Sequence, residues 1–138
     1  MSPKKFRTRH VSEAEARTYL KKAEEFYQTM LETYRQKWWN SAGLEGVHCA
    51  ISATDAILGF KARIRSAGES HNDSVDLLRS LVKHENTDQQ AFRLARVISK
   101  KNVVEYDSRD FTEEEAAAIV KDVSRYLEWI KALFVRHA

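Results

Sequence analysis

Residues 39–64 read WNSAGLEGVHCAISATDAILGFKARI, and this stretch decides the fold. Small and apolar residues recur along it at alternating spacings of four and three, which places them on one face of an α-helix. The residues of this line are Trp39, Gly43, Gly46, Ala50, Ala53, Ile57, Phe60 and Ile64. Because the first half of the line is so small, a second helix can approach it closely. The stretch therefore predicts a central helix over about residues 41–66, ended by Gly68 in a left-handed conformation.

Two further long helices are expected, one on each side of this stretch. The first begins at the capping box Ser12–Glu15 and the last at the capping box Thr112–Glu115. Apolar periodicity predicts two shorter helices between them, at residues 70–82 and 87–98. The sequence thus predicts an all-α fold, an antiparallel up-and-down four-helix bundle with one short extra helix.

The composition is that of one globular domain. Of the 138 residues, 43% are hydrophobic and 31% are charged, which leaves no sign of extensive disorder. No segment approaches the roughly 18 uninterrupted apolar residues that a membrane span needs. We therefore expect a cytoplasmic protein without a membrane partner. The single cysteine, Cys49, excludes an internal disulfide and any zinc site built on a cysteine pair.

The net charge of +3 comes from the N-terminal segment. Residues 1–10 carry four basic residues and no acidic one, so the other residues contribute 19 basic and 20 acidic side chains. Such a segment can attract phosphates, but short runs of like charge are also common at solvated termini. We expect residues 1–11 to be a basic tail without fixed structure, and residues 12–138 to form a single domain.

The central helix also carries a line of polar residues. Glu45, His48, Ser52 and Asp55 follow one another at spacings of three, four and three and share one face. One interpretation is a solvent edge, or a core histidine whose hydrogen bonds are satisfied. The other is a pocket beside the fourth helix, in which Asp55 orients a cation and His48 supplies an acid or a base.

No metal site or cofactor is predicted. The five histidines never pair at the spacings that put two ligands on one helix face, and a Glu-x-x-His pair occurs only at Glu45–His48. Cys49 lies among apolar residues and is expected to pack in the core. Arg79 and His84 could be read as a paired cation and histidine. They are five residues apart, so on a helix their side chains diverge by about 140° and do not form a site.

Trp38 and Trp39 are adjacent at the start of the central helix. Neighbouring helical positions point about 100° apart, so at most one of the two rings can lie in the core. An exposed tryptophan beside a helix of small residues favours a dimer interface. We expect the chain to be a homodimer that uses Trp38 and Trp39.

Several segments, in this order, resemble the HEPN family of small helical bundles over about residues 12–136. They are the aromatic first helix, Ser41–Gly43, His48–Ile57, Ser70–Leu78, Lys101–Tyr106 and Phe111–Ala116. The resemblance implies a four-helix bundle with a short extra helix, usually dimeric. It also implies a link to RNA-cutting toxins, their inactive relatives and modules that accompany nucleotidyltransferases.

The chain departs from the family at its catalytic motif. Active members carry an arginine, often a polar residue after it, and a histidine four to six positions after the arginine. At the matching positions this chain has Lys101, Asn102 and Tyr106. A tyrosine, with a pKa near 10, is a poor base compared with histidine. A lysine binds phosphate but lacks the planar fork of arginine.

We therefore expect a bundle that binds RNA or a nucleotide without efficient catalysis. Lys101 is expected to contact phosphate, and Asn102 and Tyr106 to donate hydrogen bonds. Arg96 and Asp55 are the second choices for ligand contacts, Arg96 because its helix holds the basic concentration of the body.

Two alternatives stay open at this point. The first is a metal-independent ribonuclease, a toxin of a toxin–antitoxin or nucleotidyltransferase-linked system, in which Tyr106 or a distant histidine replaces the missing one. The second is a non-catalytic, antitoxin-like subunit whose surface binds another protein, such as a nucleotidyltransferase.

Overall fold

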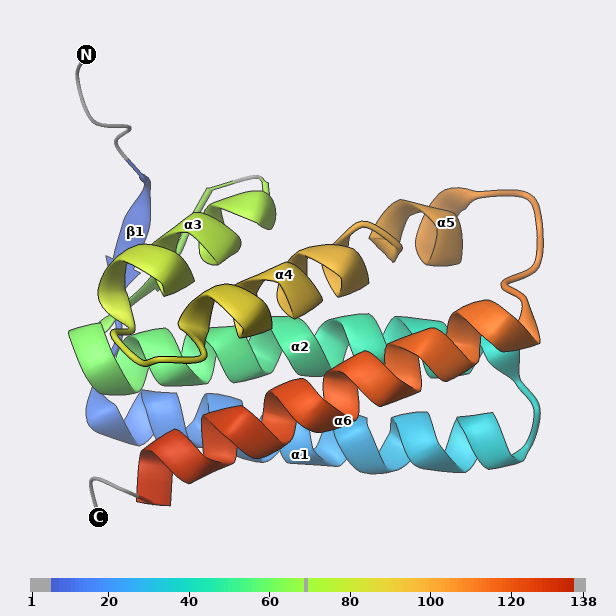
Figure 1. The fold of residues 1–138 in the computed structure, drawn as a ribbon, viewed down its shortest axis with the longest axis horizontal. Helices are drawn as coiled ribbons and strands as arrows, with labels where there is room; N and C mark the ends of the chain where they lie inside the picture. The colour runs from blue at the N-terminus through green and yellow to red at the C-terminus, as the bar shows by residue number, and fades with distance from the viewer. Residues whose placement is uncertain (1–5, 69, 136–138) are drawn as a thin grey trace.

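The chain folds around three long helices that lie side by side along the long axis of the molecule (Figure 1). A computed structural model describes residues 6–68 and 70–135. The long helices are α1 (Glu13–Arg35), α2 (Trp39–Ala62) and α6 (Glu113–Val135). Above α2 lie three shorter helices, α3 (Asn72–Leu81), α4 (Thr87–Ile98) and α5 (Lys101–Tyr106).

The helices alternate in direction. Helix α1 and the α4–α5 segment run one way along the long axis, and α2 and α6 run the other way (Figure 1). Helix α3 is the short extra helix. The predicted all-α, up-and-down bundle is confirmed. In the part of the chain that the structure describes, no helix is both long and apolar enough to cross a membrane.

The predicted helix starts are confirmed where a cap specifies them. At α1, Glu15 N donates to Ser12 Oγ and Ser12 N donates to Glu15 Oε1, at 3.1 and 3.0 Å. The same reciprocal pair joins Thr112 and Glu115 ahead of α6. Each pair satisfies two backbone donors that a helix start leaves free.

The predicted end of the central helix is wrong. Helix α2 ends at Ala62, and Arg63 takes the left-handed conformation with φ of 58°. Gly68 has no positive φ and lies beyond strand β2 (Ile64–Ser66). The apolar line continues through Ile64, but backbone pairing with another strand replaces the helix there, and periodicity alone does not report such pairing.

That other strand is β1 (Thr8–His10), which pairs antiparallel with β2, with Arg9 opposite Arg65. The expectation of a tail without fixed structure is wrong for residues 8–10. The ladder pairs this segment with β2, and Val11, which follows it, is buried and donates its N–H to Arg63 O at 2.8 Å. Residues 1–5, which hold Lys4 and Lys5, lie outside the described residues.

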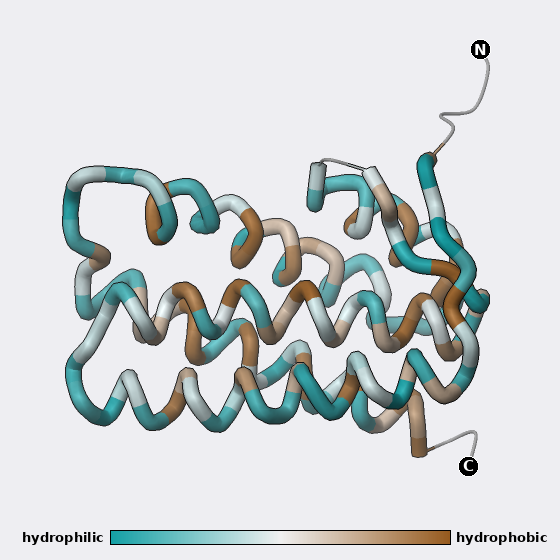
Figure 2. Tube along the Cα trace, turned by 180° about the vertical axis from the view of Figure 1, so that it is seen from behind, coloured by the Kyte–Doolittle hydropathy of each residue, from teal (hydrophilic) through white to brown (hydrophobic). Residues whose placement is uncertain are grey.

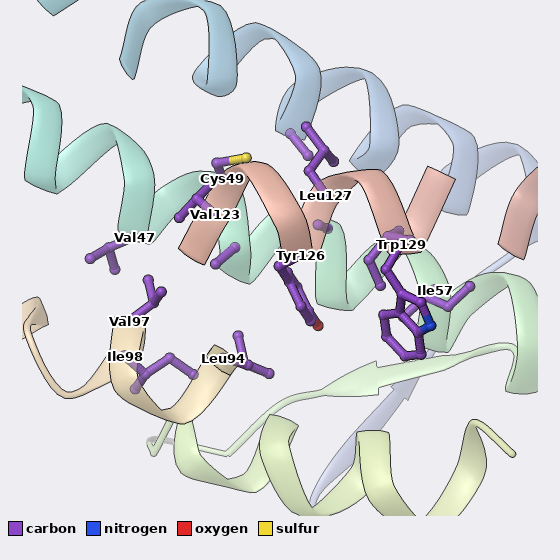
Figure 3. Packing of buried hydrophobic residues seen from close by; sticks show 14 of the residues in the cluster. Val47, Cys49, Ile57, Leu94, Val97, Ile98, Val123, Tyr126, Leu127 and Trp129 are labelled. Atoms are coloured by element: carbon purple, nitrogen blue, oxygen red, sulfur yellow. The ribbon is translucent and has the colours of Figure 1, made fainter. Parts of the chain in front are cut away.

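The core lies between α2, α4 and α6. Figure 3 shows Val47 and Ile57 of α2 facing the same space as Leu94 of α4 and Tyr126 of α6. Figure 2 shows hydrophobic residues recurring along α2. Helix α1 is hydrophilic over most of its length, and apolar residues interrupt it at intervals. Tyr126 is fully buried, and its hydroxyl lies 2.6 Å from the Thr54 hydroxyl, so its polar atom is satisfied inside the core.

The glycines of α2 explain how closely the long helices pack. A Cβ on Gly46 would collide with Ile119 of α6 and would lie 3.1 Å from the Met30 sulfur of α1. A Cβ on Gly43 would lie 2.8 Å from the Phe111 ring. The close approach predicted from the small-residue line is therefore confirmed on two sides of α2.

Candidate functional site

Helix α5 brings a charged cluster over the polar line of α2. The ammonium of Lys101 donates to Glu105 Oε2 at 2.6 Å, one helical turn apart on α5. The other carboxylate oxygen, Glu105 Oε1, lies 3.9 Å from Nε2 of His48 on α2. His48 is half-exposed and its ring lies 5.8 Å from that of Phe26. His48 of the polar line of α2 therefore faces α5 rather than empty solvent.

The other two motif residues lie on the outside of α5. The Tyr106 side chain is 76% exposed, and the Lys101 ammonium lies 5.4 Å from the centre of its ring. Asn102 is also exposed. The sequence did not predict a separate helix here; α4 ends at Ile98, and the turn at residues 99–100 starts the six-residue α5.

A second part of the cluster lies at the other end of the polar line. The Asp55 side chain is 8% exposed, and its Oδ2 lies 3.6 Å from Nε of Arg65 on β2. Burial raises the pKa of Asp55 to about 6, although the charge of Arg65 opposes this shift. A buried carboxylate whose pKa approaches neutrality is a common property of functional sites.

His71, at the N-terminal end of α3, connects the two parts. Burial is the main cause that lowers its pKa, the positive charge of Lys101 adds to this effect, and Glu105 opposes it. Arg65 and His48 lower it further. Because charges interact strongly only over short distances in water, these groups form one neighbourhood across α2, β2, α3 and α5. Among the described residues, no group of three His, Cys, Asp or Glu side chains could hold a metal ion.

Arg96 lies apart from this cluster. Its guanidinium donates to both carboxylate oxygens of Asp122 on α6, at 2.9 and 3.2 Å, and Arg93 donates to the same carboxylate. No contact among the described residues joins Arg96 to Lys101. Its pairing indicates that it fastens α4 to α6.

The Arg79 and His84 side chains make separate contacts, but α3 ends at Leu81, so His84 lies beyond the helix and the helical spacing does not apply. Arg79 lies over the Phe92 ring and near Asp88, whereas His84 Nδ1 accepts from Trp129 Nε1 at 3.3 Å. Cys49 is buried, and burial raises the pKa of its thiol to about 12, which makes it inert. These residues are structural.

Three members of the cluster, Arg65, His71 and Glu105, were missed by the sequence analysis. Arg65 and His71 fell at the end of the predicted central helix and at the start of the next predicted helix, and neither has a recognisable spacing to Lys101. Glu105 carried one usable signal, its i, i+4 spacing from Lys101, which favours an ion pair on a helix.

The two tryptophans separate as expected. Trp38 is 59% exposed, whereas Trp39 is half-buried, with its ring 5.3 Å from that of Tyr34. They line a hollow of about 360 Å³, which Asp110 and Phe111 complete. The hollow lies at the end of the bundle where the α1–α2 turn meets the loop before α6.

Comparison with known proteins supports the fold. No family model matches the sequence, and no curated protein matches it. The crystal structure of an archaeal HEPN homologue superimposes with a TM-score of 0.65 at 17% sequence identity, covering 86% of this chain and 96% of that chain. At this identity the match shows the fold alone. The chain has a HEPN-like fold, which confirms the structural part of the resemblance.

Proposed function

We propose that this HEPN-like bundle binds RNA or a nucleotide at the α5 face, without efficient catalysis and as a homodimer. The observation that carries the proposal is the pairing of Lys101 with the exposed ring of Tyr106. An exposed aromatic ring offers a stacking surface to any base, and an adjacent cation offers a contact to its phosphate. Asn102 adds an amide that can donate to the same ligand.

Weak catalysis follows from the chemistry of these side chains. Tyr106 is a poor base near neutral pH, and the Lys101 ammonium is already paired with Glu105. A ligand phosphate must compete with that carboxylate. This competition limits both the affinity of the site and the stabilisation that Lys101 can give to a transition state.

The dimer part of the proposal rests on Trp38. Its large ring projects at one end of the bundle beside a hollow, in a position where burial requires a second surface. Aromatic anchors seated in hollows are typical of the centres of protein interfaces. We place the interface at this end of the molecule, where the α1–α2 turn meets the loop that connects α5 to α6.

The experiment is fluorescence anisotropy with labelled single-stranded RNA across a salt series. Wild-type protein is expected to bind, and Lys101→Ala is expected to weaken binding and to flatten the salt dependence by about 0.7 in slope, the loss of one phosphate contact. Lys61→Ala serves as the matched control, because it removes one half-buried lysine of α2 outside the cluster. Equal losses in both variants would overturn the site.

The basic N-terminal segment needs its own control. Removing residues 1–10 would also remove β1, so Lys4→Ala/Lys5→Ala is the better variant, since it lowers the charge and leaves the paired strand in place. Binding that disappears in this variant, with Lys101→Ala unaffected, would assign the RNA contact to the tail.

A second candidate is a metal-independent ribonuclease, favoured by the position of two histidines. His48 and His71 both lie in the neighbourhood of Lys101. In such a reaction one imidazole takes the proton of the ribose 2′-hydroxyl, and the oxygen attacks phosphorus. The second histidine, in its protonated imidazolium form, then donates its proton to the departing 5′-oxygen, leaving a 2′,3′-cyclic phosphate.

The same RNA samples, run on a denaturing gel, test this candidate. Cleavage with cyclic-phosphate ends that is lost in His48→Ala and in His71→Ala, but kept in His84→Ala, would support it. Intact RNA after prolonged incubation with wild-type protein would exclude it.

A further inference from the structure

A cavity of about 190 Å³ opens where β1, α2, β2 and α3 meet. Its polar lining comes chiefly from Arg9, Asp55, Arg65 and His71, one from each of these four elements. The volume is well above the ~30 Å³ that one water molecule occupies in the liquid. His71 places the cavity within the electrostatic reach of Lys101 on α5.

The carboxylate of Asp55 is buried in this wall without its full set of donors. Among the described residues its contact is with Arg65, and the 3.6 Å between Oδ2 and Nε is longer than a hydrogen bond. Buried charged groups normally have several hydrogen-bond partners, because leaving water without them costs several kcal/mol. Both oxygens therefore remain able to accept from a ligand.

Arg65, in turn, has a hydrogen-bond donor that lacks an acceptor. Its Nη1 donates to the Tyr19 hydroxyl at 3.0 Å and its guanidinium lies 5.4 Å from the centre of that ring, which holds the side chain in place. Its Nε is buried and has no hydrogen-bond acceptor. The cavity wall therefore offers a two-oxygen acceptor next to the guanidinium of Arg65, whose buried Nε faces Asp55.

This pattern selects one ligand chemistry. A phosphate would be repelled by Asp55 at short range, and a cation by Arg9 and Arg65. A neutral edge with two adjacent N–H donors followed by an acceptor matches the wall. Of the four RNA bases, guanine alone has that order, with N1–H and the N2 amino group for the carboxylate and O6 for the Arg65 guanidinium. The other three bases have at most one donor beside an acceptor on the same edge.

We propose that the cavity between β1, α2, β2 and α3 binds a guanine base, with Asp55 accepting from N1–H and N2–H and the Arg65 guanidinium donating to O6. The inference rests on the proposed function, because the base belongs to the RNA or nucleotide that α5 holds by its phosphate. It assigns the ligand class to guanine nucleotides and the base contact to residues outside the HEPN-like motif.

The test is a competition experiment with GMP, IMP, AMP, CMP and UMP against the wild-type protein. GMP is expected to bind about 10- to 100-fold more tightly than AMP, CMP and UMP, the range of one good bidentate contact. IMP lacks the N2 amino group and is expected to fall in between. Asp88→Asn, an exposed Asp-to-Asn change on α4, is the matched control and should keep this order.

The decisive variant is Asp55→Asn, which keeps the shape of the side chain. An asparagine offers one acceptor and one donor, the pattern that pairs with adenine, so the preference should move from GMP toward AMP. A change in preference cannot come from misfolding, which would weaken all five nucleotides alike.

Two results would overturn the inference. If the five nucleotides bind equally and Asp55→Asn changes nothing, the Asp55–Arg65 contact is a closed ion pair only, while Lys101-dependent RNA binding would leave the proposed function standing. If neither nucleotides nor RNA bind, both proposals fall.

Discussion

Lys101 and Glu105 form an ion pair at 2.6 Å across one turn of α5, in a position where the lysine would otherwise face a ligand. The carboxylate raises the pKa of Lys101 and occupies the ammonium. In the proposed RNA or nucleotide site, Glu105 therefore competes with phosphate for Lys101. This arrangement predicts a gain of function from removing an acid.

Glu105→Gln is expected to strengthen RNA binding, because the ammonium of Lys101 becomes free for a phosphate. We expect an affinity several-fold higher at low salt and a salt dependence about 0.7 steeper in slope, measured by anisotropy. Glu114→Gln, which changes the net charge equally at the exposed start of α6, is the control. An equal gain in both variants would show a general charge effect and no local competition.

Asp55→Asn is expected to stabilise the protein at pH 7.5 and to leave stability unchanged at pH 3. The folded pKa of Asp55 is about 6, above its ordinary 3.8, so the native state binds the proton more tightly than the unfolded chain does. Stability therefore falls as pH rises from about 4 to 6. The difference corresponds to at most about 3 kcal/mol, and asparagine removes it.

Thermal unfolding followed by circular dichroism at the two pH values measures this effect. A lower midpoint for Asp55→Asn at pH 7.5 would mean that the pair with Arg65 is net stabilising. A more stable Asp55→Asn variant would show that the native carboxylate lowers the stability of the fold. Groups kept for ligand binding often carry such a cost in stability.

Glu115→Ala is expected to destabilise the fold at neutral pH and much less at pH 2. The hydrogen bonds from Arg109, together with those from Thr112, hold the pKa of Glu115 down to about 2, below its ordinary 4.5. The stabilisation is therefore complete above about pH 4.5 and is lost as pH falls toward 2. Losing the cap costs about 1 kcal/mol, which urea unfolding at both pH values resolves; equal losses at both would contradict the electrostatic origin.

Gly46→Ala is expected to destabilise the bundle by about 1–3 kcal/mol, although alanine is the better helix former. The new methyl group would collide with Ile119 and press on the Met30 sulfur. Gly68→Ala is the matched control, because its methyl group would meet the movable end of the Asp73 side chain. Chemical denaturation of both variants compares them; a neutral or stabilising Gly46→Ala would mean that α6 can move away from α2.

Trp38→Glu is expected to convert a dimer into a monomer with an unchanged circular dichroism spectrum. The exposed ring would be replaced by a charge that a protein interface cannot bury without a partner. Sedimentation at micromolar concentrations measures the mass. The control is Leu31→Glu, which places the same charge at an exposed apolar position of α1. A monomeric wild-type protein would refute the dimer proposal.

The sequence by itself determined the helices and their buried faces. The seam from Gly43 to Ile57, and the capping boxes at Ser12 and Thr112, depend on residues within one or two turns of each other, so spacing alone reveals them. The same locality predicted that one of the two tryptophans is exposed, whereas the Lys101–Tyr106 segment was singled out by the resemblance to HEPN domains.

Tertiary structure alone decided which residues meet. Arg65 reaches Asp55 because β1 pairs with β2 and ends the central helix at Ala62, and His71 joins them because α3 folds back over α2. Such contacts depend on strand register and helix packing between segments distant in sequence, and no spacing encodes them. For the same reason the sequence did not reveal that Arg96 of α4 pairs with Asp122, because Asp122 lies on another helix, α6.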